Sequence, residues 1–336
     1  MSFTSHMQAA LAEAIAAALR APRELRSAAE AIGRQRAELL ATVHDAELSR
    51  EFLRRATEGS WPHCTAISAA LEARVHGAPL AAVLAGVPVL AHEANRRPGK
   101  AVRLIARFAR SVHLPTGVRI PGVAAGRQHD SGYPVRAEMR PLAKELARRT
   151  LGFPATGRLL LITGGSQGAA PLNRWVEGQL DELAARGIHA LCLTGPGGRD
   201  ERLERAGSLV HFLPFCHQMA AAYSAADLAV TRAGAGTLAE LATCRTPAIL
   251  VPLPHAADDH QTANALQAAA GGAAILLPER ELGRLGEVAF GGITDNAALA
   301  AMRDALALAD AANHWEELAR DTVAWAQARG GRVAPA

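Results

Sequence analysis

Apolar residues in the second half of the chain occur in short runs, each followed by a longer segment with helical spacing. The runs that we predict as strands are residues 158–163, 188–194, 209–213, 227–231, 248–252 and 273–277. Strands and helices that alternate in this way predict a parallel sheet covered by helices on both faces. Ligands bind such a sheet at the carboxyl ends of its strands, so the residues after each run are candidates for a binding site.

The first half of the chain has a different pattern. Residues 7–58 are rich in Ala, Glu and Arg, and their apolar positions have helical spacing, which predicts helices and no strand. Residues 79–91 combine an apolar helix with a short strand, residues 87–90, that ends at His-Glu-Ala-Asn, residues 92–95. A polar sequence directly after a buried strand is typical of a ligand position.

The length of 336 residues suggests about two domains. We expect an N-terminal domain over residues 1–145, a connection within residues 134–153, and a second domain over residues 150–295. The last part, residues 296–336, reads as helical as far as residue 329, with Trp315 and Trp325 as packing residues.

Residues 100–112 predict an amphipathic helix with one basic face. The basic residues on that face are Lys100, Arg103, Arg107 and Arg110. The pattern fits contact with anionic lipid headgroups and fits a solvated surface helix equally well.

Composition restricts the function classes without choosing one. Hydrophobic residues make up 49% of the chain and charged residues 20%, as in globular proteins, and the formal charge of +4 suits an anionic ligand or an acidic membrane surface. Aromatic residues, at 4%, are too few for the stacking surfaces of RNA-binding domains, which disfavours nucleic acid as a partner.

The four cysteines are far apart and predict free thiols in a reducing cytoplasm. The sequence shows no secretory signal, and its longest apolar stretch, about 14 residues, is shorter than the ~20 that a membrane span needs.

The first candidate binding segment is Thr-Gly-Gly-Ser-Gln-Gly-Ala, residues 163–169, between a predicted strand and a predicted helix. Glycine lets the backbone turn sharply and bring N–H groups against an anion, and a helix N-terminus adds a favourable dipole. The segment is neither a Walker loop nor the dinucleotide motif Gly-x-Gly-x-x-Gly, which argues against an ATPase and a dehydrogenase. A diphosphate fits this turn, although such turns also occur without a ligand.

The second candidate segment, residues 231–240, again follows a predicted strand and leads through a glycine-rich turn into a helix. Glu240 has two interpretations here. Its carboxylate can accept both hydroxyls of a ribose, or it can stabilise the helix N-terminus as acidic residues in a first turn do.

The third candidate segment, residues 252–264, follows the next predicted strand and contains His260, Gln261 and Asn264. Neutral side chains that donate and accept hydrogen bonds suit sugar hydroxyls. For His260 alone, a structural role is the more common one. A zinc site formed by His255, Asp258 and His260 is conceivable by residue type but matches no usual ligand spacing.

Taken together, these segments resemble the MurG family of bacterial N-acetylglucosaminyltransferases. The matching residues are Gly164, Gly165, Ser166, Gln167, Gly168, Ala169, Leu172, Asn173, Phe215, Met219, Tyr223, Ala226, Asp227, Arg232, Gly234, Thr237, Glu240, Pro247, Pro252, Asp259, His260, Gln261, Asn264 and Ala265. Upstream, residues 92–95 resemble the family's His-Glu-Gln-Asn, and Gly-Tyr-Pro-Val-Arg at residues 132–136 resembles its Gly-Asn-Pro-Val-Arg. The resemblance covers about residues 79–279.

The resemblance implies an α/β GT-B fold, with two Rossmann-like domains facing a cleft, and an inverting transfer without a cofactor or a protein-bound metal. The donor is UDP-N-acetylglucosamine and the acceptor a lipid-linked muramyl-peptide of peptidoglycan synthesis, at the inner face of the cell membrane. By resemblance, Ser166 and Arg136 lie near the diphosphate, Phe215 and Met219 border the uracil, Glu240 holds the ribose, and His260, Gln261 and Asn264 contact the sugar. The remaining substrate-binding residues that it implies are Asn95, Gly165, Gln167, Gly234 and Thr237.

The N-terminal region departs from the family. The family's glycine-rich first turn, Gly-Gly-Thr-Gly-Gly-His, is absent, and helix-forming sequence replaces its first strands. The candidates left for the catalytic base are His92 and Glu93, which also fit a structural hydrogen-bonding pair. Two classes of protein therefore stay open: a transferase with a remodelled, helix-rich N-terminal domain, and a non-catalytic UDP-sugar-binding homologue or the product of a gene damaged at its 5′ end.

Overall fold

The structure is a computed structural model that describes residues 89–328, apart from residues 137, 206 and 255–258. The helices predicted for residues 7–58 and for the start of residues 79–91 lie outside the described residues. The chain divides into two compact units, Met1–Val89 with Arg107–Arg110, and Leu90–Ala106 with Ser111–Ala336. Every helix and strand below belongs to the second unit.

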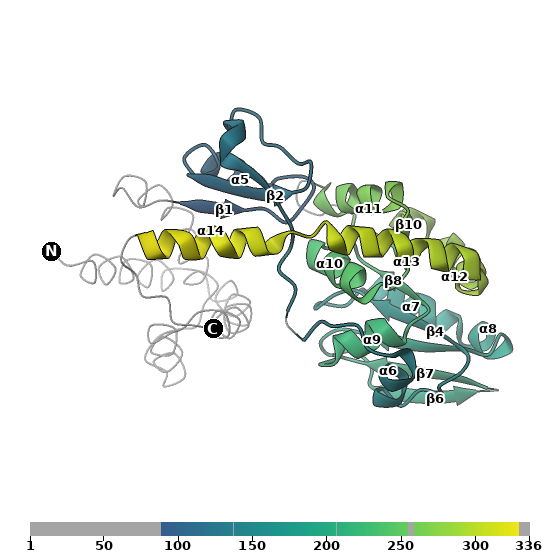
Figure 1. The fold of residues 1–336 in the computed structure, drawn as a ribbon. Helices are drawn as coiled ribbons and strands as arrows, with labels where there is room; N and C mark the ends of the chain where they lie inside the picture. Colours follow the sequence, from purple (N-terminus) through teal and green to yellow (C-terminus); the bar gives the residue numbers. More distant parts are fainter. Residues whose placement is uncertain (1–88, 137, 206, 255–258, 329–336) are drawn as a thin grey trace, which may run out of the picture. The chain divides into compact units, whose positions relative to one another are not determined.

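The second unit contains a seven-stranded sheet with the order β10-β9-β8-β4-β5-β7-β6 (Figure 1). Its strands are β4 (Arg158–Thr163), β5 (Ile188–Leu193), β6 (Glu201–Arg205), β7 (Ser208–Leu213), β8 (Leu228–Thr231), β9 (Ala248–Leu250) and β10 (Ala274–Leu276). All neighbouring pairs are parallel except β6 and β7, which are antiparallel. The predicted parallel sheet is therefore confirmed, with each predicted strand within two residues of its observed bounds.

Within the large sheet, the strand that the sequence did not predict is β6, at the edge of the sheet. Its residues, Glu-Arg-Leu-Glu-Arg, include four charged side chains and therefore lack the apolar run used to predict the others. Charged residues on an edge strand discourage pairing with another chain, so this composition suits the position.

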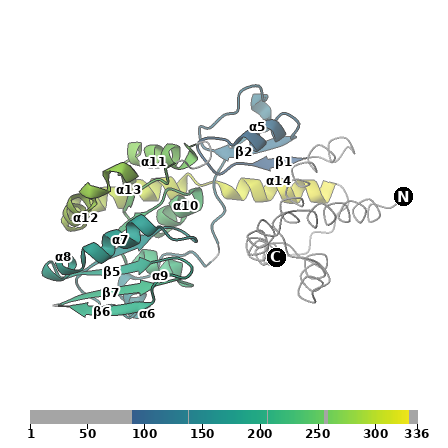
Figure 2. The ribbon, with the colours of Figure 1, turned by 180° about the vertical axis from the view of Figure 1, so that it is seen from behind.

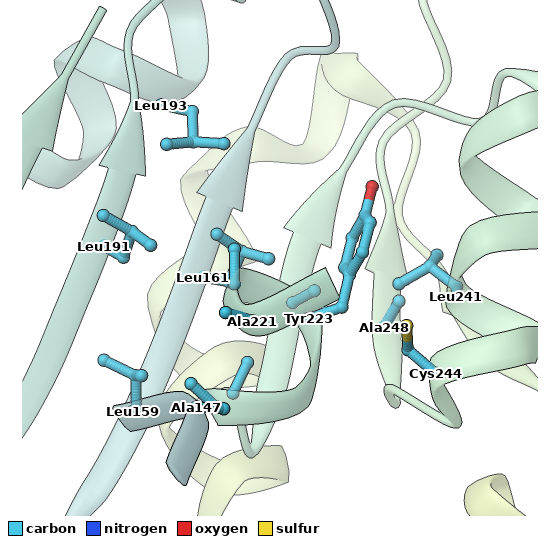
Figure 3. Packing of buried hydrophobic residues seen from close by; sticks show 14 of the residues in the cluster. Ala147, Leu159, Leu161, Leu191, Leu193, Ala221, Tyr223, Leu241, Cys244 and Ala248 are labelled. Atoms are coloured by element: carbon cyan, nitrogen blue, oxygen red, sulfur yellow. The ribbon is translucent and has the colours of Figure 1, made fainter. Parts of the chain in front are cut away.

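Helices cover both faces of the large sheet (Figure 2). Leu160 and Ile162 of β4 face one way, into a core shared with α7 (Ala170–Gly178) and α8 (Leu180–Ala185). Leu159 and Leu161 face the other way, into a core shared with α9 (Met219–Ala225) and α10 (Ala235–Cys244). Figure 3 shows this second core, where leucines of β4 and β5 pack beneath Ala221 and Tyr223. Apolar side chains of a parallel strand are thus buried on both faces, as the continuous apolar runs predicted.

Three further strands, β1 (Leu90–His92), β2 (Ser111–Pro115) and β3 (Gln128–Ser131), form a small parallel sheet in that order. Between them lie α5 (Lys100–Ile105) and the 3-10 helix η1 (Ala125–Arg127). The prediction of one helix over residues 100–112 is wrong beyond Ile105. Val112 and Leu114 are buried in the sheet, and β2 pairs with β1 on one side and with β3 on the other. Hydrogen bonding to these two strands therefore determines the structure of this segment, despite the helical spacing of its apolar residues. Arg107 and Arg110 consequently do not continue the basic face of α5.

The segment predicted as a connection contains a helix, α6 (Lys144–Thr150), which belongs to the core of the large sheet through Ala147. An ionic cluster holds it there. The buried Asp227 carboxylate pairs with Arg148 (2.8 Å), Lys144 and Arg158, and it also accepts the Leu159 N–H (2.8 Å). Burial alone would raise the pKa of Asp227, but hydrogen bonds from Lys144 and Leu159 and the nearby positive charges lower it overall.

The C-terminal part is helical from Glu279, earlier than the predicted start at residue 296. It comprises η3 (Glu279–Arg284), α12 (Leu285–Thr294), α13 (Asn296–Ala311) and α14 (Trp315–Ala328), while α11 (His260–Ala270) precedes β10. Asp295 caps α13 by accepting the Ala298 N–H (3.0 Å). Trp315 is half-buried, and the side chain of Trp325 lies outside the described residues. None of the helices within residues 89–328 combines the length and apolarity that crossing a membrane requires.

Asp227→Asn should lower the free energy of unfolding by about 3 kcal/mol or more, because it leaves the buried Arg148 guanidinium without its anionic partner. Urea-induced unfolding measures the loss. Since the folded-state pKa of Asp227 is depressed, its contribution is present above the unfolded-state pKa and lost as the pH falls through the folded-state value. The matched control is Glu201→Gln, which removes an exposed ion pair with Arg199 and should cost less than about 1 kcal/mol. Equal losses for the two variants would contradict the role given to Asp227.

Candidate functional site

The three segments predicted from the sequence follow β4, β8 and β9, which are adjacent strands of the large sheet. β4 and β8 end together at the pair Thr163 and Thr231, and Thr231 in turn pairs with Leu250 of β9. Because the three strands are parallel, all three segments leave the sheet at the same edge. The sheet order therefore brings together the clusters that the sequence separates by up to about 100 residues.

The turn after β4 packs directly against the turn after β5. A Cβ at Gly168, which has φ +71°, would collide with the Thr194 carbonyl, and a Cβ at Gly195 would lie 2.7 Å from the Gln167 carbonyl. Asn173 of α7 also donates to the Thr194 carbonyl (2.8 Å). The glycines are thus needed for the close contact of the two turns, which leaves Gly165, Ser166 and Gln167 exposed at the tip, directly before α7. An exposed turn at a helix N-terminus is a suitable position for a diphosphate.

The turn after β8 ends at Gly234, the N-cap of α10, which has extended backbone and no side-chain cap. The first turn of α10 contains Thr237, half-buried, and no acidic residue. Glu240 therefore lies in the second turn, and the interpretation of this residue as a stabiliser of the helix N-terminus is wrong.

The Glu240 carboxylate is instead held by two side chains from other elements. Arg136 donates to its Oε1 at 3.2 Å, and Tyr223 of α9 hydrogen-bonds to it. Burial first, and then the charge and hydrogen bond of Glu240, raise the pKa of the Tyr223 phenol well above its usual value. In Figure 3 the hydroxyl of Tyr223 points toward the end of the sheet marked by the arrowheads, the carboxyl ends of the strands. Glu240 is thus an oriented carboxylate at the edge where a ligand is expected.

Arg232 connects the ends of two strands. Its buried guanidinium donates to the carbonyls of Val251 (3.1 Å) and Pro252 (3.4 Å), and it forms an ion pair with Glu279. Sequence reasoning identified Arg232 only as one of the residues that match the family pattern. The signal that could have shown its role is a lone cation directly after a predicted buried strand, where it must find buried acceptors.

The amides of Gln261 and Asn264 on α11 make hydrogen bonds to protein groups. Gln261 Oε1 accepts the N–H groups of Ala233 (3.3 Å) and Leu253 (2.9 Å). The buried Asn264 accepts the Arg96 N–H (2.9 Å) on Oδ1 and donates from Nδ2 to the Ala233 carbonyl and to Asn95 Oδ1, both at 3.1 Å. Both donors of Asn264 are therefore used within the protein, which favours a positioning role for this residue over a direct contact with sugar.

His260 is the first residue of α11, after Asp259, whose φ is +54°. His255 and Asp258, the other members of the conceivable zinc set, lie outside the described residues. Among the residues that the structure describes, no group of three or more His, Cys, Asp or Glu side chains is arranged to hold a metal.

The two candidates for the catalytic base differ in what they bind. The buried Glu93 carboxylate accepts the N–H groups of Ala94 and Asn95 (both 2.9 Å) and the Asn95 side-chain amide on one oxygen, and the Gly99 N–H (3.0 Å) on the other. It shapes the turn after β1. His92 Nε2 lies 2.9 Å from the Gly132 carbonyl, which can only accept, so in the neutral ring Nδ1 is the basic nitrogen. This geometry favours His92 over Glu93 as a base.

The predicted uracil contacts lie near α9. Phe215 is 57% exposed, with its ring in edge contact with His217 (4.8 Å between centroids), and Met219 is the first residue of α9, partly packed against the core. An exposed phenylalanine beside a binding edge is consistent with a flat ligand, and these two assignments remain predictions.

The model of the glycosyltransferase family 28 C-terminal domain matches residues 159–318. A curated transferase of Opitutus terrae, named UDP-N-acetylglucosamine--N-acetylmuramyl-(pentapeptide) pyrophosphoryl-undecaprenol N-acetylglucosamine transferase, is 43% identical over 256 residues, covering 74% of this chain and 68% of the relative. A protein of the same name from Prochlorococcus marinus is 42% identical over 201 residues, covering 59% of this chain and 54% of the relative. The crystal structure of Acinetobacter baumannii MurG superposes with a TM-score of 0.53 at 30% identity, covering 68% of this chain and 64% of that one.

These comparisons confirm the α/β GT-B fold class. They also show that the chain spans only about half to two thirds of the length of these relatives. A second family model, UreF, matches residues 5–94. The sequence that replaces the expected first strands is therefore similar to a different family, which agrees with the missing glycine-rich turn.

Asn264→Ala should release the turn after β1, because it removes the acceptor of the Arg96 N–H and both donors to neighbouring elements. We expect faster hydrogen exchange of the Arg96 amide and a loss of about 1–3 kcal/mol in the free energy of unfolding. Gln267→Ala, at an exposed position of the same helix, is the control and should change neither quantity. Unchanged hydrogen exchange of the Arg96 N–H in Asn264→Ala would show that the Asn264 side chain does not hold the turn after β1 in place.

Proposed function

The chain belongs to the MurG family of glycosyltransferases, and from this premise we propose that its large sheet binds UDP-N-acetylglucosamine and that the protein transfers the sugar to a lipid-linked muramyl-peptide acceptor. Membership follows from the 43% identity to the Opitutus terrae transferase across two thirds of that protein. The single structural observation that carries the proposal is the meeting of the turns after β4, β8 and β9 at one sheet edge.

In this proposal each part of the donor has a counterpart at that edge. The diphosphate lies against the exposed tip of residues 165–167 and the N-terminus of α7. The ribose hydroxyls bind the Glu240 carboxylate, which Arg136 and Tyr223 already orient. Phe215 and Met219 border the uracil, and Gly234, Thr237 and His260 complete the pocket. Gln261, Asn264 and Asn95 act mainly by fixing these turns.

The reaction is a direct displacement. An acceptor hydroxyl attacks the anomeric carbon, its proton passes to a base, and UDP departs with the bonding electrons, which inverts the anomeric centre. Backbone N–H groups of Ser166 and Gln167 and the exposed guanidinium of Arg136 stabilise the charge that develops on the diphosphate. His92 Nδ1 is our candidate for the base, and Glu93 holds the turn beside it.

The acceptor implies a site of action at the cytoplasmic face of a membrane, which the protein approaches as a peripheral protein. On α5, Lys100 and Arg103 are exposed next to Leu104, which is 57% exposed. Apolar side chains beside basic ones suit an anionic lipid surface. Arg107 and Arg110 are also exposed, although they lie beyond the end of the helix.

A second candidate function is a UDP-sugar-binding homologue without transfer activity. The observation that favours it is the UreF match over residues 5–94, where the family's glycine-rich acceptor turn would be expected. Both functions share the donor site, so only turnover separates them.

Transfer of radiolabelled N-acetylglucosamine from UDP-N-acetylglucosamine to a lipid-linked muramyl-pentapeptide tests the proposed function directly. We expect labelled product with the full chain, and also a higher thermal midpoint with millimolar donor, because a ligand of the folded state stabilises it. A thermal shift without product would support the non-catalytic binder. The absence of both would remove the donor assignment.

Glu240→Ala should weaken UDP binding by more than about 1 kcal/mol, or more than about fivefold in Kd, because a charge-assisted hydrogen-bonding partner of the ribose is lost. Isothermal titration calorimetry with UDP measures the change. Glu287→Ala, on the exposed surface of α12, serves as the control and should bind as the unmodified protein does. If Glu240→Ala binds UDP with unchanged affinity, this carboxylate serves only to anchor Arg136 and Tyr223.

A further inference from the structure

We propose that the phenol of Tyr133 is an additional donor-binding group, whose hydroxyl donates a hydrogen bond to the diphosphate of a bound nucleoside diphosphate; this inference rests on the proposed function. Tyr133 is 37% exposed and lies in the segment that follows β3, where the MurG-like pattern has Asn. None of the turns discussed above includes it.

The backbone of Tyr133 is fixed from both sides. Asn313, between α13 and α14, accepts the Tyr133 N–H on Oδ1 (2.7 Å) and donates from Nδ2 to the Tyr133 carbonyl (3.1 Å). The preceding residue packs so tightly that any Cβ at Gly132 would collide with the Asn313 side chain. Since one amide holds both backbone groups of Tyr133, the starting point of its side chain is well defined.

The ring of Tyr133 lies against the first turn of α10. A Cβ built at Gly236 would be 3.2 Å from the Tyr133 hydroxyl oxygen and 3.3 Å from the carbon that bears it. Glycine at position 236 therefore provides the space that the phenol occupies. The first N–H groups of a helix have no partner within the helix, and Gly234 supplies no side-chain cap, so this is an electropositive end.

The position of the phenol relative to Glu240 matches the layout of a nucleoside diphosphate. Gly236 and Glu240 are four residues apart, so they share one face of α10, about 6 Å apart along its axis. Tyr133 lies over the first and Arg136 pairs with the second, so residues 133–136 follow this face. A ribose that binds Glu240 through its 2′ and 3′ hydroxyls carries its 5′-diphosphate on the opposite side of the ring, toward the N-terminal end of α10. Because β4 and β8 are adjacent and end together, this end of α10 and the tip of residues 165–167 leave the sheet at the same edge, where one diphosphate can face both.

The neighbouring strand end carries a further polar group at this edge of the sheet. Thr231, the last residue of β8, is fully buried, and its hydroxyl oxygen has no hydrogen-bond partner among the described residues. A buried hydroxyl without a partner is costly in a finished structure. It lies three residues before Gly234, at the same edge as the phenol.

Calorimetric titration of the full chain with UDP and, separately, with uridine tests the proposal. For Tyr133→Phe we expect UDP affinity to fall roughly tenfold, because a hydrogen bond to a charged group is lost, while uridine affinity stays unchanged. The variant keeps the ring, and an unchanged thermal midpoint without ligand confirms that it folds as the unmodified protein does. A loss of affinity that is equal for uridine and UDP would indicate a packing role and overturn the proposal, as would unchanged UDP binding.

Gly236→Ala provides the second, independent variant. Its methyl group should displace the phenol and weaken UDP binding by threefold or more in the unmodified background, but have little effect in the Tyr133→Phe background, where no hydroxyl contact remains. Additive effects of the two substitutions would contradict the proposal. The failure of the proposed function is distinguishable, because the unmodified protein itself would then not bind UDP. If only this inference fails, the unmodified protein binds UDP, and Tyr133→Phe either binds UDP as well or loses affinity for UDP and uridine equally.

Discussion

Two amide side chains on one face of α11 connect the turns that form the candidate site. Gln261 accepts N–H groups from the turns after β8 and β9, and Asn264 links the turn after β8 to the turn after β1. These turns have few apolar side chains of their own, so hydrogen bonds to side chains fix their backbones. Arg232 and Glu93 fix the same turns, Arg232 through the carbonyls after β9 and Glu93 through the N–H groups after β1.

The same arrangement explains why several polar residues that match the family pattern are positioning residues in this structure. A buried amide or carboxylate must satisfy its hydrogen-bonding atoms, and Asn264 and Glu93 do so within the protein. The groups left for a ligand are those at exposed tips, such as Ser166 and Phe215, and those that are oriented but reachable, such as Glu240. Site formation and ligand contact are thus divided between two sets of residues.

The large sheet and the N-terminal region resemble different protein families. The large sheet carries the family pattern with its strand order, glycine turns and braces in place, whereas residues 5–94 match a different family model. The proposed binding of a nucleotide sugar depends only on the large sheet. Transfer also needs an acceptor and a base, and His92, tied to Gly132 at the end of the small sheet, is the residue through which this chain would supply the base.

The sequence by itself determined the strand and helix alternation of the large sheet, because six apolar runs separated by helical spacing admit one kind of fold, and it located the three turns through their glycines. The prediction of strands failed where a strand forms by pairing with its neighbours and has no apolar run of its own. The charged edge strand β6 and the strand β2 form because neighbouring strands offer hydrogen bonds, which no local pattern records. Only the tertiary structure determined which polar side chains form hydrogen bonds within the protein. Partners such as Asn264 and Arg96, or Asn313 and Tyr133, lie more than 160 residues apart, and their contact arises from packing.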